Sequence, residues 1–156
     1  QKPIKGRTDT WDVTDYVHLD IDEKADIVFD VNNLKRFDEL FGFHKKFDNI
    51  FCLELSEYLI NPLNAILNLS DWLDENGTLY MSFHFIYPMH KPEGTDMLRY
   101  TDNWIKQTFS HYGFSDIDIT PRSAKQPELL NSFYLSEGMK SDGDTSVTGW
   151  LVKAKK

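Results

Sequence analysis

The stretch "FDNIFCLELSEYLINPLNAILNLSDWLDENGTLYMSFHF", residues 47–85, decides the fold class of this chain. Its apolar start, residues 47–55, predicts a buried strand, and "TLYMSFHF", residues 78–85, predicts another. The segment between them has the spacing of an amphipathic helix. A helix that connects two buried strands is typical of a parallel sheet with helical crossovers.

The connecting helix carries the clearest start and stop signals in the sequence. Asn61 is a suitable N-cap, Pro62 occupies the favoured first helical position, and Gly77 is expected to end the helix. Four apolar side chains recur at helical spacing and predict one buried face: Leu63, Ile66, Leu67 and Leu73.

The same alternation continues on both sides of this unit. Further strands are predicted at residues 16–21, 25–31, 115–120 and 147–154, and further helices at residues 34–41, after Thr101, and around "PELLNSFY". We therefore expect an α/β fold with a mostly parallel sheet, in a single domain over residues 1–156. Residues 1–15 lack periodicity and are expected to form an arm or loop.

The composition and net charge of the chain argue against several classes of protein. The 156 residues are 40% hydrophobic and 27% charged, and no apolar run approaches the ~20 residues of a membrane span. The net charge of -8 argues against general nucleic-acid binding. The single cysteine, Cys52, cannot form an intramolecular disulfide and is flanked by apolar residues, which predicts a buried, inert thiol. Without a secretion signal, a soluble cytoplasmic protein is expected.

Polar side chains gather where the predicted strands end. Parallel sheets bind ligands at the carboxyl ends of their strands, so these residues are expected to share one rim. The alternative is that each acid caps the helix that follows it. The residues in question are Asp20, Asp22, Asp30, Asn32, Glu54, Ser56, His84, Tyr87 and His90.

The order of several motifs resembles the class I S-adenosylmethionine-dependent methyltransferases over about residues 14–156. They are "YVHLDID", "ADIVFDV", "FDNIFCLELSEYLINP", "WLDENGTLYMSFHF", "YPMHKPEGTDMLRYT", "HYGF" and "GWLVKAKK". The resemblance implies a Rossmann-like sheet with an antiparallel C-terminal strand pair. It also implies S-adenosylmethionine as cofactor and a small polar molecule as methyl acceptor.

The resemblance assigns cofactor-binding residues by position. Asp20, with Ile21, matches the acid that holds the ribose hydroxyls, and Asp30, with Val31 and Asn32, matches the place beside the adenine. The segment after the next strand often carries a glutamate near the cofactor. The match there is Glu54 or Glu57, together with Leu55 and Ser56.

One family feature is missing. The family begins with a strand and a Gly-x-Gly loop that lets the backbone approach the cofactor, but the only glycine before Asp20 is Gly6. We therefore expect a sheet that lacks the usual first strand. Three explanations stay open: the N-terminal portion is absent, the strands ending at Asp20 and Leu55 pair directly, or a second copy or another partner chain completes the sheet. The alternative function is a non-catalytic or truncated methyltransferase-like module that binds a partner protein.

Catalytic candidates come from the loop after residue 84. His84 and His90 are candidate bases, Tyr87 is a candidate catalytic and acceptor-orienting residue, and Arg99 suits a carboxylate or phosphate of the acceptor. The alternatives are a structural sheet histidine at position 84 and an Arg99–Asp96 pair that pins the loop. No metal site is predicted, because His84, His90 and Asp96 have no recognised ligand spacing.

Overall fold

The computed structural model describes residues 13, 15–42, 45–89, 95–125, 127–139 and 146–156. These residues fall into two compact units, with the boundary between Val31 and Asn32. The units are taken one at a time below. Within the described ranges, no helix combines the length and the hydrophobicity needed to cross a membrane.

The first unit contains two short parallel strands, β1 (Leu19–Asp20) and β2 (Ile27–Val28). They are much shorter than the strands predicted at residues 16–21 and 25–31. The connection between them includes a turn in which the carbonyl of Asp22 accepts the N–H of Ala25 at 3.0 Å. The link is too short for a helical crossover, so only a minimal parallel ladder forms.

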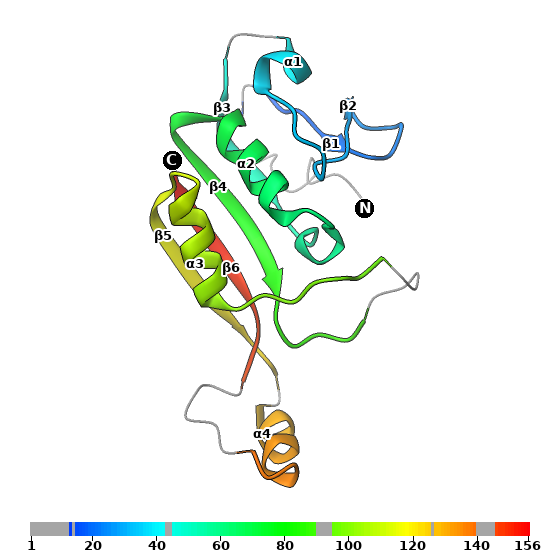
Figure 1. Ribbon diagram of the computed structural model, residues 1–156, viewed down its shortest axis with the longest axis vertical. Helices are drawn as coiled ribbons and strands as arrows, with labels where there is room; N and C mark the ends of the chain where they lie inside the picture. The colour runs from blue at the N-terminus through cyan, green and yellow to red at the C-terminus, as the bar shows by residue number, and fades with distance from the viewer. Residues whose placement is uncertain (1–12, 14, 43–44, 90–94, 126, 140–145) are drawn as a thin grey trace. The chain divides into compact units, whose positions relative to one another are not determined.

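The second unit is built on a four-stranded sheet in the order β3-β4-β6-β5 (Figure 1). The strands are β3 (Phe47–Cys52), β4 (Leu73–His84), β5 (Ser115–Ser123) and β6 (Val147–Lys155). β3 and β4 are parallel, whereas β6 pairs antiparallel with both β4 and β5.

This topology corrects one expectation and confirms another. The prediction of a mostly parallel sheet was wrong for the described residues, since the sheet is mixed and mostly antiparallel. The physical reason is that β1 and β2 pair with each other in a sheet of their own, so β3 and β4 form the parallel part of the larger sheet. Direct pairing of the strands that end at Asp20 and Leu55 is not among the described pairings. The antiparallel C-terminal pair, β5 with β6, is confirmed.

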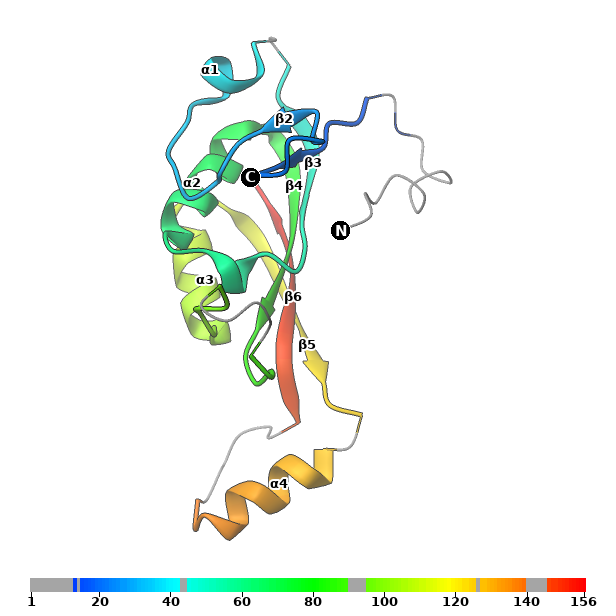
Figure 2. The ribbon, with the colours of Figure 1, turned by 90° about the vertical axis from the view of Figure 1, so that its right-hand side faces the viewer.

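Helices α2 (Pro62–Trp72) and α3 (Asp102–His111) lie on the same face of this sheet (Figures 1 and 2). The core lies between them and β4, and it is fully or almost fully buried. Its main side chains are Leu79, Met81 and Phe83 of β4, Ile66 and Leu69 of α2, and Ile105 and Phe109 of α3. The remaining helices are α1 (Phe37–Phe41), the 3-10 turn η2 (Ser56–Tyr58) and α4 (Pro127–Ser136), which lies between β5 and β6 in the chain.

Helix α2 begins at the predicted residue but ends earlier than expected. It stops at Trp72, and Gly77 lies inside β4. A Cβ atom on Gly77 would lie 2.9 Å from the carbonyl oxygen of Phe47, so glycine allows β3 and β4 to approach closely. The predicted apolar face is also partly wrong, because Leu63 and Leu67 are exposed while Ile66 is buried.

The two long helices have different N-terminal caps. Thr101 caps α3 as predicted, since its hydroxyl accepts the N–H of Trp104 at 3.3 Å. Asn61 occupies the N-cap position of α2 but makes no side-chain cap bond. The side-chain oxygen of Asn32 instead accepts the N–H groups of Ile60 and Asn61, at 2.8 and 2.9 Å. Asn32 thus supplies the side-chain hydrogen-bond acceptor at the start of α2.

Candidate functional site

Three ionisable side chains converge where β3 and β4 end. Glu54 follows β3, Glu57 lies in η2, and His84 is the last residue of β4. The Nε2 atom of His84 lies 3.2 Å from Oε2 of Glu54 and 3.2 Å from Oε1 of Glu57. One ligand atom from each residue lies within 4.8 Å of the other two. We call Glu54, Glu57 and His84 the Glu–His cluster.

The cluster is buried on one side and reachable on the other. The side chains of Glu57 and His84 are 1% and 2% exposed, whereas that of Glu54 is 42% exposed. Moving a carboxylate away from water is costly unless charge or hydrogen bonds compensate. The close approach of His84 to both acids supplies such compensation, and Glu54 connects the group to solvent.

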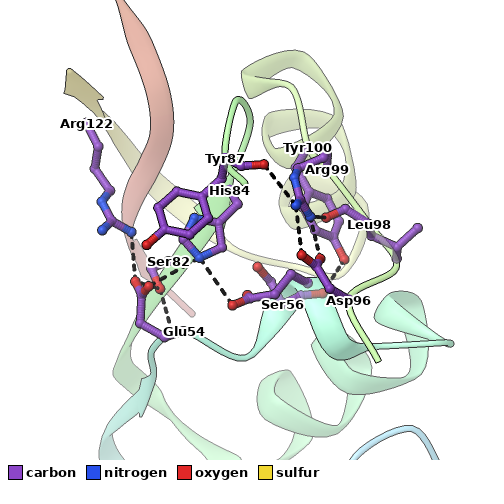
Figure 3. A network of polar contacts seen from close by, with 11 residues as sticks. Glu54, Ser56, Ser82, His84, Tyr87, Asp96, Leu98, Arg99, Tyr100 and Arg122 are labelled. Carbon is purple, nitrogen blue, oxygen red and sulfur yellow. Dashed lines mark hydrogen bonds and ion pairs between the residues drawn. The ribbon is translucent and has the colours of Figure 1, made fainter. Parts of the chain in front are cut away.

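The backbone and side chain of Glu54 are held in an unusual conformation. Glu54 has a φ angle of 54°, in the left-handed region that residues with a Cβ seldom adopt. Its N–H donates to the hydroxyl of Ser82 at 2.7 Å, and that hydroxyl donates to Oε1 of Glu54 at 3.0 Å. Arg122 of β5 donates to the same oxygen at 2.7 Å (Figure 3). These donors fix Oε1 and leave Oε2 directed toward His84.

The ring of Tyr87 lies over the ring of His84. The two rings are stacked, with centroids 4.1 Å apart and an interplanar angle of 29° (Figure 3). Tyr87 is 41% exposed, whereas His84 is almost fully buried. A molecule that approaches this end of the sheet would therefore meet Tyr87 before His84.

Arg99 pins the segment after this loop. It donates to both carboxylate oxygens of Asp96, at 2.5 and 2.8 Å, and to the carbonyls of Leu98 and Tyr87. The hydrogen bonds to Asp96 raise the pKa of the Arg99 guanidinium above its ordinary value. The predicted Arg99–Asp96 pair is thus confirmed. The same segment is tied to η2, because the carbonyl of Glu57 accepts the N–H groups of Met97 and Leu98.

Two neighbouring ionisable groups are kept neutral by their surroundings. Burial, followed by the nearby carboxylate of Glu57, raises the pKa of the Tyr100 hydroxyl, which donates to the carbonyl of Ser56 at 2.7 Å. The same two causes, in the same order, raise the pKa of Cys52 to about 12. Cys52 is buried, as predicted, and its thiol is therefore inert at neutral pH.

The predicted cofactor residues divide between the two units. Asp20, Ile21, Asp30 and Val31 belong to the first unit, and Asn32, Glu54, Leu55 and Ser56 to the second. Asp20 ends β1, and its Oδ1 accepts the N–H groups of Ile21 and Asp22 at 2.7 and 3.2 Å. The side chain of Asp30 is exposed and Val31 is buried.

In the second unit, the structure brings Glu54 together with two of the predicted catalytic residues, His84 and Tyr87. The candidate base His90 lies outside the described residues. Sequence reasoning missed Ser82 and Arg122. Ser82 lies two positions before His84 on β4, and this period-2 spacing could have indicated it. No signal identified Arg122, which lies 68 residues from Glu54.

No protein-family model matches the chain, and no curated protein matches it in sequence. Solved structures match it in fold. An S-adenosylmethionine-dependent methyltransferase from Archaeoglobus fulgidus has a TM-score of 0.58 and 12% identity, with coverage of 88% of this chain and 74% of that chain. A methyltransferase of the same description from Mesorhizobium loti has a TM-score of 0.56 and 14% identity, with coverage of 88% and 78%.

A third match is phosphoethanolamine N-methyltransferase 2 of Haemonchus contortus, whose structure holds S-adenosyl-L-methionine. Its TM-score is 0.50 and its identity 12%, with coverage of 70% of this chain. The chain spans 33% of the length of that enzyme. Together these comparisons show that the chain has an α/β fold with a mixed sheet that resembles the fold of S-adenosylmethionine-dependent methyltransferases.

Proposed function

We propose that this chain takes part in S-adenosylmethionine-dependent methyl transfer to a small polar molecule. The observation that carries the proposal is the likeness in fold to two S-adenosylmethionine-dependent methyltransferases, each over 88% of this chain. The motif order described above supports the same proposal. The polar residues at the ends of β1, β3 and β4 supply side chains of the required kinds.

The acids of the first unit fit the chemistry of the cofactor. Asp20 ends β1 and is partly exposed, and Asp30 is exposed just after the neighbouring parallel strand β2. Carboxylates in such positions can accept hydrogen bonds from ribose hydroxyls and from an adenine amine. Asp20 with Ile21 would hold the ribose, and Asp30 with Val31 would lie near the adenine. Glu54, Leu55 and Ser56 stand at the end of β3, where the resemblance places further cofactor contacts.

When bound, the cofactor supplies an electrophilic methyl group whose transfer needs little more than alignment with the acceptor. The residues of this chain would bind and orient. Tyr87, at the exposed side of the Glu–His cluster, would contact the acceptor first. His84 behind it would accept a proton where the acceptor must lose one. Arg99 donates hydrogen bonds to Asp96 and to the carbonyls of Leu98 and Tyr87. It would therefore position the loop and so orient Tyr87.

Calorimetric titration of the purified chain with S-adenosylmethionine and S-adenosylhomocysteine tests the proposal. We expect dissociation constants in the micromolar range, about -8 kcal/mol. Asp20→Ala should weaken binding at least about tenfold because it removes the ribose acceptor. Asp38→Ala is the matched control, since Asp38 is an exposed acid on α1 that pairs with Arg36. Absence of binding by the folded chain would contradict the proposal and favour the non-catalytic, partner-binding module. Equal affinity in the wild type and Asp20→Ala would remove Asp20 from the site.

A further inference from the structure

We propose that the Glu–His cluster binds one divalent first-row transition-metal ion, such as Zn²⁺ or Mn²⁺. The ion would be held by Nε2 of His84, Oε2 of Glu54 and Oε1 of Glu57. This inference rests on the geometry of these three residues and not on the proposed methyl transfer. While Nε2 of His84 holds the ion, His84 would not be the proton acceptor of that reaction.

The first argument is distance. Ligand atoms bonded to one ion at about 2.0–2.2 Å, in tetrahedral or octahedral geometry, lie roughly 3 to 3.5 Å from one another. His84 Nε2 lies 3.2 Å from a carboxylate oxygen of each glutamate. The three ligand atoms, one per residue, lie within 4.8 Å of one another. Only small side-chain adjustments would bring all three onto one ion.

The second argument is the way in which the carboxylate of Glu54 is oriented. In metal sites the ligating carboxylates are themselves hydrogen-bonded, which fixes the oxygen that faces the ion. Ser82 and Arg122 both donate to Oε1 of Glu54, at 3.0 and 2.7 Å. Oε2 is the oxygen that faces His84 (Figure 3). The arrangement thus has both a ligand set and the donors that orient it.

The third argument is charge and access. Arg122 already pairs with Glu54, but two carboxylates meet beside the buried Glu57, and a divalent ion between them would be electrostatically favourable. Such an ion supplies positive charge while His84 binds it as a neutral ligand. One imidazole with two carboxylates suits borderline ions better than Ca²⁺, which takes oxygen ligands, and better than thiolate-selective ions. Three protein ligands leave positions for water or an oxygen of a bound molecule, on the side where Glu54 is exposed.

The competing interpretation is a plain ion pair in which a protonated His84 neutralises the acids. Calorimetric titration of the chelator-treated chain with Zn²⁺ alone and Mn²⁺ alone separates the two interpretations. We expect saturable binding of one ion per chain to the wild type. Glu54→Gln should weaken it at least about 100-fold, since loss of an outer-shell partner alone costs 10–100-fold. Glu39→Gln should bind as the wild type does, because Glu39 is an exposed glutamate whose partner, Lys35, lies on the protein surface.

Glu54→Gln is the decisive variant because its half-exposed side chain makes a folded protein the expected result. Glu57→Gln and His84→Gln extend the test to the buried ligands, and circular dichroism in the absence of metal checks their fold. A metal-dependent rise in melting temperature should occur in the wild type and in Glu39→Gln but not in Glu54→Gln. Failure of the wild type to bind either ion would overturn the proposal. So would equal affinity in the wild type and Glu54→Gln, which would place the ion elsewhere.

Discussion

The second unit carries a charged cluster near each end of β4, and the two clusters differ in burial. At the carboxyl end, the Glu–His cluster joins β3, η2 and β4, and two of its three side chains are almost fully buried. At the amino end, Asp71 of α2 contacts Lys46 and lies near Lys156, and its side chain is 41% exposed. Charged groups of the same kinds therefore interact in a lower dielectric at the carboxyl end of β4 than at its amino end.

The cluster around Asp71 has a structural role that its contacts explain. The carboxylate of Asp71 accepts the N–H of Phe37 at 2.9 Å, which satisfies the start of α1. The ammonium of Lys46 donates to both the carboxylate and the carbonyl of Asp71. Lys156 donates to the carbonyls of Ser70 and Leu73 and so fastens the end of the chain to the end of α2. Each contact joins one secondary-structure end to another.

The side-chain contacts described for the Glu–His cluster join its own members and link Glu54 to Ser82 and Arg122. His84 faces both carboxylates, and of these three side chains Glu54 is the exposed one. The comparison teaches that burial of the partner side chains, rather than the number of charges, separates the candidate site from the structural cluster. Three predictions test this contrast.

The largest effect is expected for Glu57→Ala. The substitution removes one of the two carboxylates beside the buried His84 and opens a cavity, which together should cost about 3–5 kcal/mol of the free energy of unfolding. Urea denaturation of the variant and the wild type measures the difference. Glu39→Ala, on the surface of α1, is the control and should change stability by less than about 0.5 kcal/mol. A loss of stability as small as that of Glu39→Ala would mean that the buried cluster contributes no more to stability than a surface ion pair does.

A smaller effect is expected for Asp71→Ala. The variant loses the acceptor for Phe37 and the ion pair with Lys46, but water reaches the site and screens the charges. We expect a loss of about 1 kcal/mol, also measured by urea denaturation. Asp48→Ala is the matched control because Asp48 pairs with Lys45 on an exposed surface. A loss as large as that of Glu57→Ala would erase the contrast between the clusters.

The smallest effect is the pH dependence that Asp71 contributes. Burial alone would raise the pKa of Asp71, but the N–H of Phe37 and the ammonium of Lys46 outweigh it and hold the pKa below its ordinary value. A lowered folded-state pKa stabilises the fold above the unfolded value of about 3.9, and this stabilisation disappears as the pH falls through the folded value.

The stability difference between the wild type and Asp71→Asn should therefore be larger at pH 7 than at pH 3. Since the carboxylate is well exposed, we expect this change to stay below about 1 kcal/mol. Urea denaturation at the two pH values measures it. A difference that grows toward low pH would show that the lowered pKa of Asp71 does not govern this part of the stability.

Much of the second unit could be predicted from sequence because burial leaves a periodic pattern. The starts of α2 and α3, the short helix α1 and the strands β3, β4 and β6 all follow from apolar spacing and capping residues. The expected position of Glu54 and His84 at strand ends also follows, since strand ends are where apolar runs stop. The structure places these two side chains in contact.

Prediction from the apolar pattern fails where a feature depends on which segments pair with one another rather than on which residues are buried. Hydrophobic alternation does not encode strand direction, so the predominance of antiparallel pairing was not predicted, and the antiparallel β5–β6 pair was expected from the resemblance alone. β1 and β2 have apolar residues enough for longer strands, yet each forms a ladder of only two residues. The contact of Arg122 with Glu54 depends on β5 reaching its place through β6, which local sequence does not encode.

The left-handed backbone at Glu54 points to a trade-off between folding stability and the geometry of the Glu–His cluster. Glycine, or more rarely asparagine, adopts such a φ angle at little cost, whereas a glutamate there sacrifices roughly 1 kcal/mol or more of folding stability. A chain selected for stability alone would be expected to carry glycine at this position. This chain instead carries a long carboxylate that Ser82 and Arg122 aim into the Glu–His cluster. At position 54, glycine would thus favour folding stability, whereas glutamate favours the proposed site.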